Sequence, residues 1–180
     1  MYARELGTDY HQFRSFFQGV FQDALVGKAD LKELISEHED LWHADGNVDA
    51  LLARWFSTED ARNEPMLALV ASLRSSGTPC YLATNQEKYR GEYIRDVMFK
   101  DEFNAYFVSA FIGSKKPSPE YFRAVLAEIS ARQPGIQPSD ILFLDDSPEH
   151  IEGAKEVGLD AHLFTSTEQA YNLLSLPIAR

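Results

Sequence analysis

The stretch Ile141-Leu142-Phe143-Leu144-Asp145-Asp146-Ser147-Pro148 decides the fold class. Its four apolar residues predict a buried strand of a parallel sheet, and the proline suits the first turn of a helix that follows. Two adjacent carboxylates at the end of such a strand are costly unless a cation or hydrogen-bond donors compensate their charge. Oxygen ligands of this kind suit Mg²⁺, and the alternative is that one carboxylate caps the helix at Pro148. We therefore predict a metal site at Asp145 and Asp146.

Short apolar runs alternate with helical patterns on both sides of this stretch. Further strands are expected at residues 79–84, 105–109 and 161–164, with amphipathic helices between them. This order is typical of an α/β protein with a Rossmann-like three-layer core, whose parallel sheet binds ligands at the carboxyl ends of its strands. The sequence therefore predicts a core domain over residues 61–180.

The first sixty residues contain helical patterns only. Apolar side chains recur at helical spacing from Phe13 to Phe21, along one side of a helix over residues 31–42 that Asp30 would cap, and from Val48 to Phe56 behind Asn47. Stripes of this kind favour an apolar core over a ligand-binding role. We predict a small all-helical domain over residues 1–60.

Composition excludes several classes of protein. The 180 residues are 44% hydrophobic and carry 28 acidic against 17 basic side chains, giving a net charge of -11 that opposes nucleic-acid binding. No apolar run approaches the roughly 20 residues of a transmembrane helix. Cys80 is the single cysteine, so an intramolecular disulfide is impossible. We expect a cytoplasmic monomer or homodimer with neither nucleic-acid nor membrane partners.

Two more polar groups stand at the ends of predicted strands. Thr84 and Asn85 follow the strand at 79–83 and can hold an anionic oxygen, although a turn or helix cap is the alternative. Lys116 lies in a loop held by Pro117 and Pro119 that can aim its ammonium group across the sheet edge, although an exposed lysine is the alternative. His150 follows the acidic pair, and we predict that it faces solvent. Cys80 is expected to be an inert thiol.

In this order, the motifs resemble the haloacid dehalogenase-like hydrolase superfamily, in the branch that carries a helical cap. The matching segments are Tyr81-Leu-Ala-Thr84-Asn85, Lys116-Pro-Ser-Pro-Glu120 and Phe143-Leu-Asp145-Asp146-Ser-Pro-Glu149. The resemblance implies that Thr84 binds the transferring phosphoryl oxygen and that Lys116 neutralises its charge. It also implies that Asp145 and Asp146 hold Mg²⁺, that Asn85 contacts the substrate, and that residues 1–60 form the cap.

The family's Asp-x-Asp motif is absent from the 180 residues. In the family this motif ends the first strand, and its first carboxylate is the nucleophile. The segment His43–Asp49 has no apolar strand before it and is expected to be a loop. Losing a central strand would leave two neighbouring strands with unpaired backbone groups, each costing about 1 to 3 kcal/mol if buried. We expect an upstream segment to be missing through truncation or a misplaced start.

The leading functional hypothesis is a Mg²⁺-dependent phosphatase for a small phosphorylated metabolite, such as a sugar phosphate. It would act through an aspartyl-phosphate whose nucleophile lies outside this chain. A 2-haloacid dehalogenase, which needs no metal, is an alternative that the paired aspartates disfavour. A catalytically inactive binding module is the third: the missing nucleophile favours it, whereas the retained Thr84, Lys116 and paired aspartates speak against it.

Overall fold

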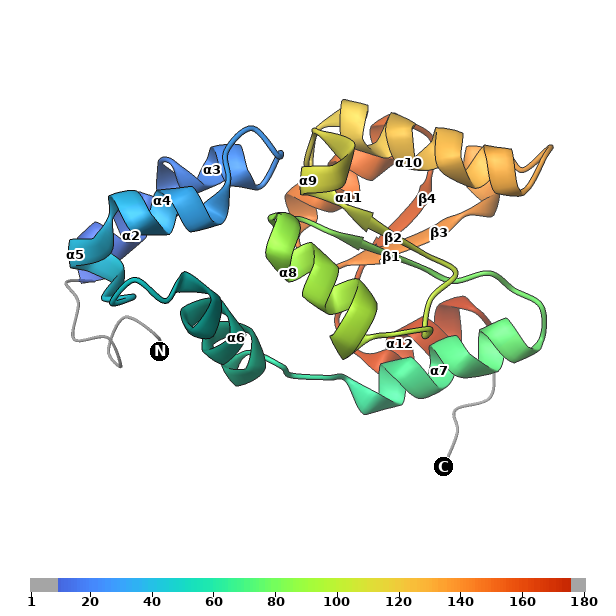
Figure 1. Ribbon diagram of the computed structural model, residues 1–180. Coiled ribbons are helices and arrows are strands. Elements are labelled where there is room, and N and C mark those ends of the chain that lie inside the picture. The colour runs from blue at the N-terminus through green and yellow to red at the C-terminus, as the bar shows by residue number, and fades with distance from the viewer. Residues whose placement is uncertain (1–9, 176–180) are drawn as a thin grey trace.

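The computed structural model describes residues 10–175 as a helical bundle joined to an α/β core (Figure 1). In the bundle, the helices are α2 (Tyr10–Gln18), α3 (Phe21–Ala24), α4 (Leu31–Glu37), α5 (Glu39–Trp42) and α6 (Val48–Thr58). In the core, the elements in chain order are α7 (Glu64–Ser75), β1 (Tyr81–Thr84), α8 (Lys88–Tyr93), a π-helix (Ile94–Met98), β2 (Ala105–Val108), α9 (Ser109–Ile112), α10 (Pro119–Arg132), a 3-10 helix (Pro138–Asp140), β3 (Leu142–Asp145), α11 (Pro148–Glu156), β4 (Asp160–Leu163) and α12 (Thr167–Leu173). The predicted α/β class with an added helical region is confirmed.

The bundle forms where the sequence places helix caps and aromatic stripes. The Asp30 carboxylate accepts a hydrogen bond from the Lys32 amide at 2.8 Å, and Asn47 accepts one from the Ala50 amide at 3.1 Å, as the cap residues predicted. The buried aromatic residues form one cluster: Phe16, Phe21, Trp42, Trp55 and Phe56. The bundle therefore has an apolar core of its own.

Two of the predicted bundle helices are broken. The helix expected over residues 31–42 divides at His38, whose backbone leaves the helical region at φ -120° and ψ 43°. Its imidazole Nδ1 lies 2.8 Å from the Leu34 carbonyl and occupies an acceptor of the ending helix. The aromatic stripe from Phe13 to Phe21 divides at Gly19 and Val20, because glycine is a weak helix former. In both places, one or two residues interrupt a helix whose apolar spacing was correctly predicted.

The core contains two parallel two-stranded sheets. In register, Thr84 of β1 lies opposite Val108 of β2, and Asp145 of β3 lies opposite Leu163 of β4. Helices α10 and α11 cover one face and share one apolar cluster with all four strands, while α7 and α12 pack against Leu144 on the other (Figure 1). The predicted three layers are present, with the carboxyl ends of all strands at one side.

The described residues divide the predicted parallel sheet into two pairs of strands, which is the arrangement that a missing central strand would leave. Among residues 10–175, no strand pairs with the second edge of β1 or of β3. All of β1 and the apolar residues of β3 remain half-exposed, although their composition is that of central strands. Both strands therefore keep an open edge.

The segments from 10 to 175 include no helix with the length and apolar character needed to cross a membrane.

Candidate active site

Lys116 is held in place by the loop that joins α9 to α10. The Asn85 side chain accepts a hydrogen bond from the Lys116 amide at 2.9 Å and donates one to the Lys116 carbonyl at 2.8 Å. On the other side, Gly153 of α11 lies so close that an added Cβ would stand 2.1 Å from the Pro117 carbonyl oxygen. The loop is thus clamped between β1 and α11, and Lys116 is only 6% exposed.

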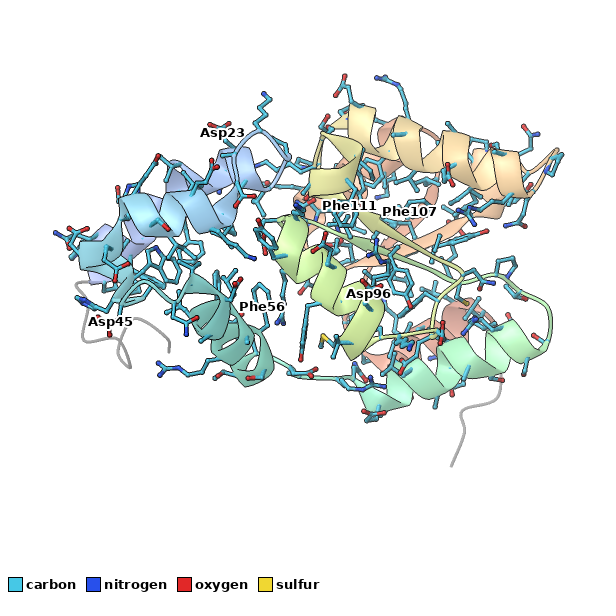
Figure 2. The ribbon with its side chains drawn as sticks, in the orientation of Figure 1. Asp23, Asp45, Phe56, Asp96, Phe107 and Phe111 are labelled. Atoms are coloured by element: carbon cyan, nitrogen blue, oxygen red, sulfur yellow. The ribbon has the colours of Figure 1, made fainter. Side chains whose placement is uncertain are left out.

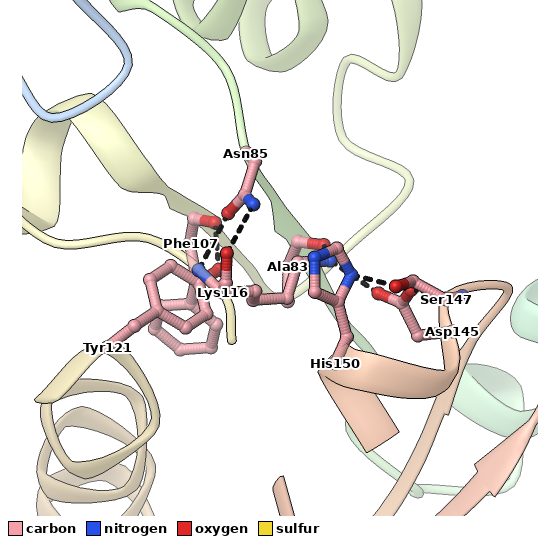
Figure 3. A network of polar contacts seen from close by, with 8 residues as sticks. All are labelled: Ala83, Asn85, Phe107, Lys116, Tyr121, Asp145, Ser147 and His150. Atoms are coloured by element: carbon pink, nitrogen blue, oxygen red, sulfur yellow. Dashed lines mark hydrogen bonds and ion pairs between the residues drawn. The ribbon is translucent and has the colours of Figure 1, made fainter. Parts of the chain in front are cut away.

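The Lys116 ammonium group connects the two sheets (Figure 3). Its Nζ donates to the Ala83 carbonyl of β1 at 2.9 Å and to Asp145 Oδ2 of β3 at 2.5 Å. The side chains of both partners in the ion pair are less than a tenth exposed. A buried pair of this kind is strongly destabilised when one partner is removed. Lys116 is therefore not the exposed lysine of the alternative interpretation.

Three hydrogen-bond donors surround Asp145 and leave one lone pair on Oδ2. Its Oδ1 accepts from the Ser147 amide at 3.0 Å and lies 2.8 Å from His150 Nδ1, while Oδ2 faces Lys116. Burial raises the pKa of this carboxyl group, but the hydrogen bonds and the Lys116 charge outweigh it, and the pKa lies below its usual range. Asp145 is therefore ionised at neutral pH.

His150 was wrongly predicted to face solvent. It stands on the first turn of α11, and its imidazole turns back toward the end of β3 (Figure 3). The third residue of a helix commonly points at the preceding turn, as in a capping box. The spacing of His150 behind Pro148 was therefore the signal that could have placed it at Asp145.

Tyr121 was also missed. Its hydroxyl donates to the Phe107 carbonyl at 2.7 Å, the residue is fully buried, and burial raises the pKa of its phenol. Tyr121 stays protonated and supports the floor of the site beside Lys116 (Figure 3). In the sequence it is one member of an apolar helix stripe, so nothing distinguished it there.

The remaining predicted site residues lie at the same edge. Thr84 ends β1 and is half-exposed, and Asp146 is exposed beside Asp145. Within residues 10–175, no hydrogen bond joins the Thr84 or Asp146 side chain to Lys116. Asn85 positions Lys116 and keeps one N–H and one lone pair for another partner. The structure thus brings together Lys116, Asp145 and Asn85.

The donor set at this edge fits Mg²⁺ better than a metal that needs a complete protein cage. In the part of the chain that the structure describes, no three His, Cys, Asp or Glu side chains are grouped to hold a metal. Mg²⁺ commonly takes one or two carboxylates and completes its shell with water and phosphate oxygens. Asp145 and Asp146 can supply those carboxylates.

The structure thus joins a helical bundle to a Rossmann-like α/β core in which a lysine and an aspartate meet at the carboxyl ends of parallel strands, the usual place for a ligand in such folds. The chain belongs to the haloacid dehalogenase-like hydrolases, whose family model matches residues 2–158.

The curated relatives include phosphatases. A sesquiterpene phosphatase from Aspergillus oryzae is 29% identical over 119 residues, which are 65% of this chain and 57% of that protein. A D-ribitol-5-phosphate phosphatase from Bacteroides thetaiotaomicron is 25% identical over 158 residues, covering 84% of this chain and 71% of that protein. A bifunctional epoxide hydrolase 2 from Rattus norvegicus is 26% identical over 113 residues, covering 60% of this chain and 20% of that protein. The chain thus spans between a fifth and about three fifths of the length of several curated relatives.

Solved structures show the same fold. A HAD family enzyme from Bacteroides thetaiotaomicron aligns with a TM-score of 0.72 at 23% identity, over 91% of this chain and 82% of that one. The same enzyme has been solved in complex with magnesium and inorganic phosphate. An L-2-haloacid dehalogenase from Xanthobacter autotrophicus aligns with a TM-score of 0.54 at 18% identity, over 93% of this chain and 70% of that one.

Proposed function

We propose that this chain forms most of a Mg²⁺-dependent phosphatase that acts on a small phosphorylated metabolite such as a sugar phosphate. The observation that carries the proposal is the buried ion pair between Lys116 and Asp145 at the carboxyl ends of β1 and β3. A lysine held there offers a fixed positive charge to a phosphoryl group, and an aspartate offers an oxygen ligand to Mg²⁺.

Each residue has a distinct role in the proposed mechanism. Lys116 binds a phosphoryl oxygen and offsets the charge that develops during transfer, and Asn85 keeps the lysine backbone in place. The Thr84 hydroxyl donates to a second phosphoryl oxygen. Asp145 and Asp146 hold Mg²⁺, which when bound supplies further positive charge at the phosphoryl oxygens. His150 orients Asp145 through its 2.8 Å contact.

The nucleophile comes from outside the described residues. The open edges of β1 and β3 favour an extended segment that pairs with both, parallel to them, and ends in an aspartate near Lys116. Such a segment would cover the half-exposed apolar residues of both strands and form an aspartyl-phosphate that water then hydrolyses. Residues 1–60 act as a cap that closes over the site.

The test is hydrolysis of para-nitrophenyl phosphate by this chain and by a form extended upstream to the next in-frame start, each with EDTA and with Mg²⁺. We expect turnover only by the extended form with metal. Lys116→Met should lower that rate at least about a hundredfold, while Lys115→Met, which removes the neighbouring lysine's contact with Gln22, should leave it nearly unchanged.

Three outcomes would contradict the proposal. Activity that survives EDTA, together with chloride release from 2-chloropropionate, favours the dehalogenase alternative. A rate insensitive to Lys116→Met places the chemistry elsewhere. If neither form hydrolyses the substrate although both are folded by circular dichroism, the site is a binding module.

A further inference from the structure

Helix α8 contacts the α/β core on one face and the helical bundle on the other. On the core side, Gly91 is pressed against β2, so that an added Cβ would stand 2.6 Å from Val108 Cγ1. On the bundle side, Tyr89 and Tyr93 pack against the aromatic cluster. Since α8 begins shortly after Asn85, one short helix lies between the candidate site and the bundle (Figure 1).

Arg90 is the most buried bundle contact of this helix. It is 8% exposed, and its Nη1 donates to the Phe56 carbonyl at 2.7 Å while Nη2 donates to the Glu59 carbonyl at 3.2 Å. Phe56 belongs to the last turn of α6, where carbonyl groups have no partner within the helix. A guanidinium group at that end also balances the negative pole of the helix dipole. Arg90 thus caps α6 from another part of the chain.

Aromatic rings fix the plane of the guanidinium group. The Arg90 Cζ lies 5.1 Å from the centre of the Phe56 ring and 5.3 Å from that of Tyr93. Figure 2 shows Phe56 between α6 and α8. Arginine stacks on rings and spans two carbonyl groups in a way that lysine cannot match.

Two tyrosine hydroxyls make further contacts on either side. Tyr93 donates to Asp60 Oδ2 at 3.0 Å, just behind α6, and Tyr89 donates to Asp30 Oδ2 at 2.6 Å, at the start of α4. Both contacts are single hydrogen bonds to groups on the bundle. Arg90 differs from both tyrosines in making two hydrogen bonds to the bundle and in being buried.

A small cavity beside Arg90 reaches toward the candidate site. Its volume is about 20 Å³, room for about one water molecule. Bundle residues Trp55 and Phe56 line it together with Gln86 and Glu87, which follow Asn85 directly. The interface is thus closely packed at α6. A movement of α6 would therefore displace residues 86–87, which line the same cavity.

We propose that Arg90 is a positioning residue that latches α6, and with it the helical bundle, to the loop that leaves β1 at the candidate site. Its effect on turnover rests on the proposed function of the bundle as a cap, whereas the latch itself is a physical contact that can be measured without activity. Releasing Arg90 frees the end of α6 and the connection to α7 while the core stays intact.

Hydrogen exchange with mass spectrometry tests the latch on the full chain. In Arg90→Met, the amides of residues 57–61 should exchange about tenfold faster than in the parent chain, while those of α10 change by less than about twofold. In Arg90→Lys, the exchange rate of these amides should lie between those of the parent chain and of Arg90→Met. One ammonium group reaches only one of the two carbonyls, those of Phe56 and Glu59. Arg95→Met is the matched control, since Arg95 lies in the π-helix after α8 and its partners among the described residues, Asp96 and the Phe111 ring, belong to the core rather than to the bundle.

Unchanged exchange at residues 57–61, or an equal increase throughout α10, overturns the proposal. If Arg90→Met does not fold, Arg90→Lys and Tyr93→Phe provide the same measurement, with Tyr93→Phe removing only the contact to Asp60. In a form that hydrolyses para-nitrophenyl phosphate, Arg90→Lys should raise KM about tenfold with little change in kcat. If exchange at residues 57–61 rises in Arg90→Met but no form hydrolyses the substrate, the role of Arg90 in holding α6 is supported and the proposed phosphatase function is wrong. If a form does hydrolyse the substrate and exchange at residues 57–61 is unchanged, only the proposed role of Arg90 is wrong.

Discussion

The helical bundle and the sheet of this protein bury their apolar residues to very different extents. In the bundle, Leu31, Ile35 and Trp42 are almost completely buried, whereas β1 and the apolar part of β3 stay half-exposed. A helix satisfies its backbone internally, so a few helices can close a core by themselves. A strand needs a partner at each edge, so a sheet closes only when every strand is present.

The largest expected effect tests this difference directly. Trp42→Ala should destabilise the bundle by about 4 kcal/mol, because the ring packs within 5.3 Å of the ring centres of Phe13, Phe16 and Trp55. Leu82→Ala on β1 should cost about 1 kcal/mol, since the side chain is only half-buried. Urea unfolding followed by tryptophan fluorescence and by far-ultraviolet circular dichroism measures both. Equal costs would mean that β1 is covered as fully as the bundle core.

The same contrast extends to two buried carboxyl groups. Asp145 faces the Lys116 ammonium group, which helps to keep its pKa low. Glu87 is 1% exposed at the junction with the bundle, and among the described residues it accepts hydrogen bonds only from the amides of Tyr89 and Arg90. Burial raises the pKa of Glu87 to about 7, and the amides offset this only in part.

A pH series of the free energy of unfolding distinguishes these two groups. The raised pKa of Glu87 gives stability that is present below its unfolded value of 4.5 and lost as the pH rises through about 7. Asp145 behaves oppositely, with stability present above its unfolded value of 3.8 and lost on acidification. Between pH 5 and 8, the parent chain should lose on the order of 3 kcal/mol relative to Glu87→Gln. Parallel curves for the two proteins would show that Glu87 is not buried in this way.

The smallest predicted effect concerns the bundle side of the junction. Asp30→Ala removes the cap of α4 and the partner of the Tyr89 hydroxyl, and should cost about 1 kcal/mol in thermal unfolding. Asp49→Ala is a suitable control, because the Asp49 side chain is 79% exposed and forms only a surface ion pair with Lys32. That control should change stability by less than about 0.5 kcal/mol. A larger loss in the control would show that surface charge governs α4.

Local signals predicted the fold class and three of the residues that meet at the site. Capping side chains placed the starts of α4 and α6, and the apolar run before Asp145 placed β3 to within one residue. Lys116 was identified because Pro117 and Pro119 directly after it hold its loop. Each of these features depends on neighbours in the sequence, which is why a single chain was sufficient to find them.

Features that depend on tertiary contact could not be predicted in this way. His150 reaches Asp145 because α11 starts immediately after β3, which turns its first residues toward the strand end. Arg90 caps α6 across an interval of 34 residues, and no periodicity encodes such a contact. The break at His38 arises from one side chain competing for a helix carbonyl. The order and spacing of motifs thus predict individual helices and strands better than they predict the contacts between them.

The close approach of Gly153 to the Pro117 carbonyl restricts how this protein can vary. Any side chain at position 153 would enter the space of a backbone oxygen and displace the loop that holds Lys116. A substitution at Gly153 would therefore disturb the position of Lys116, although Gly153 itself is not one of the proposed ligand-binding residues. A library of substitutions selected for stability alone should therefore find position 153 as intolerant as Lys116 itself, which makes α11 a poor place to begin engineering.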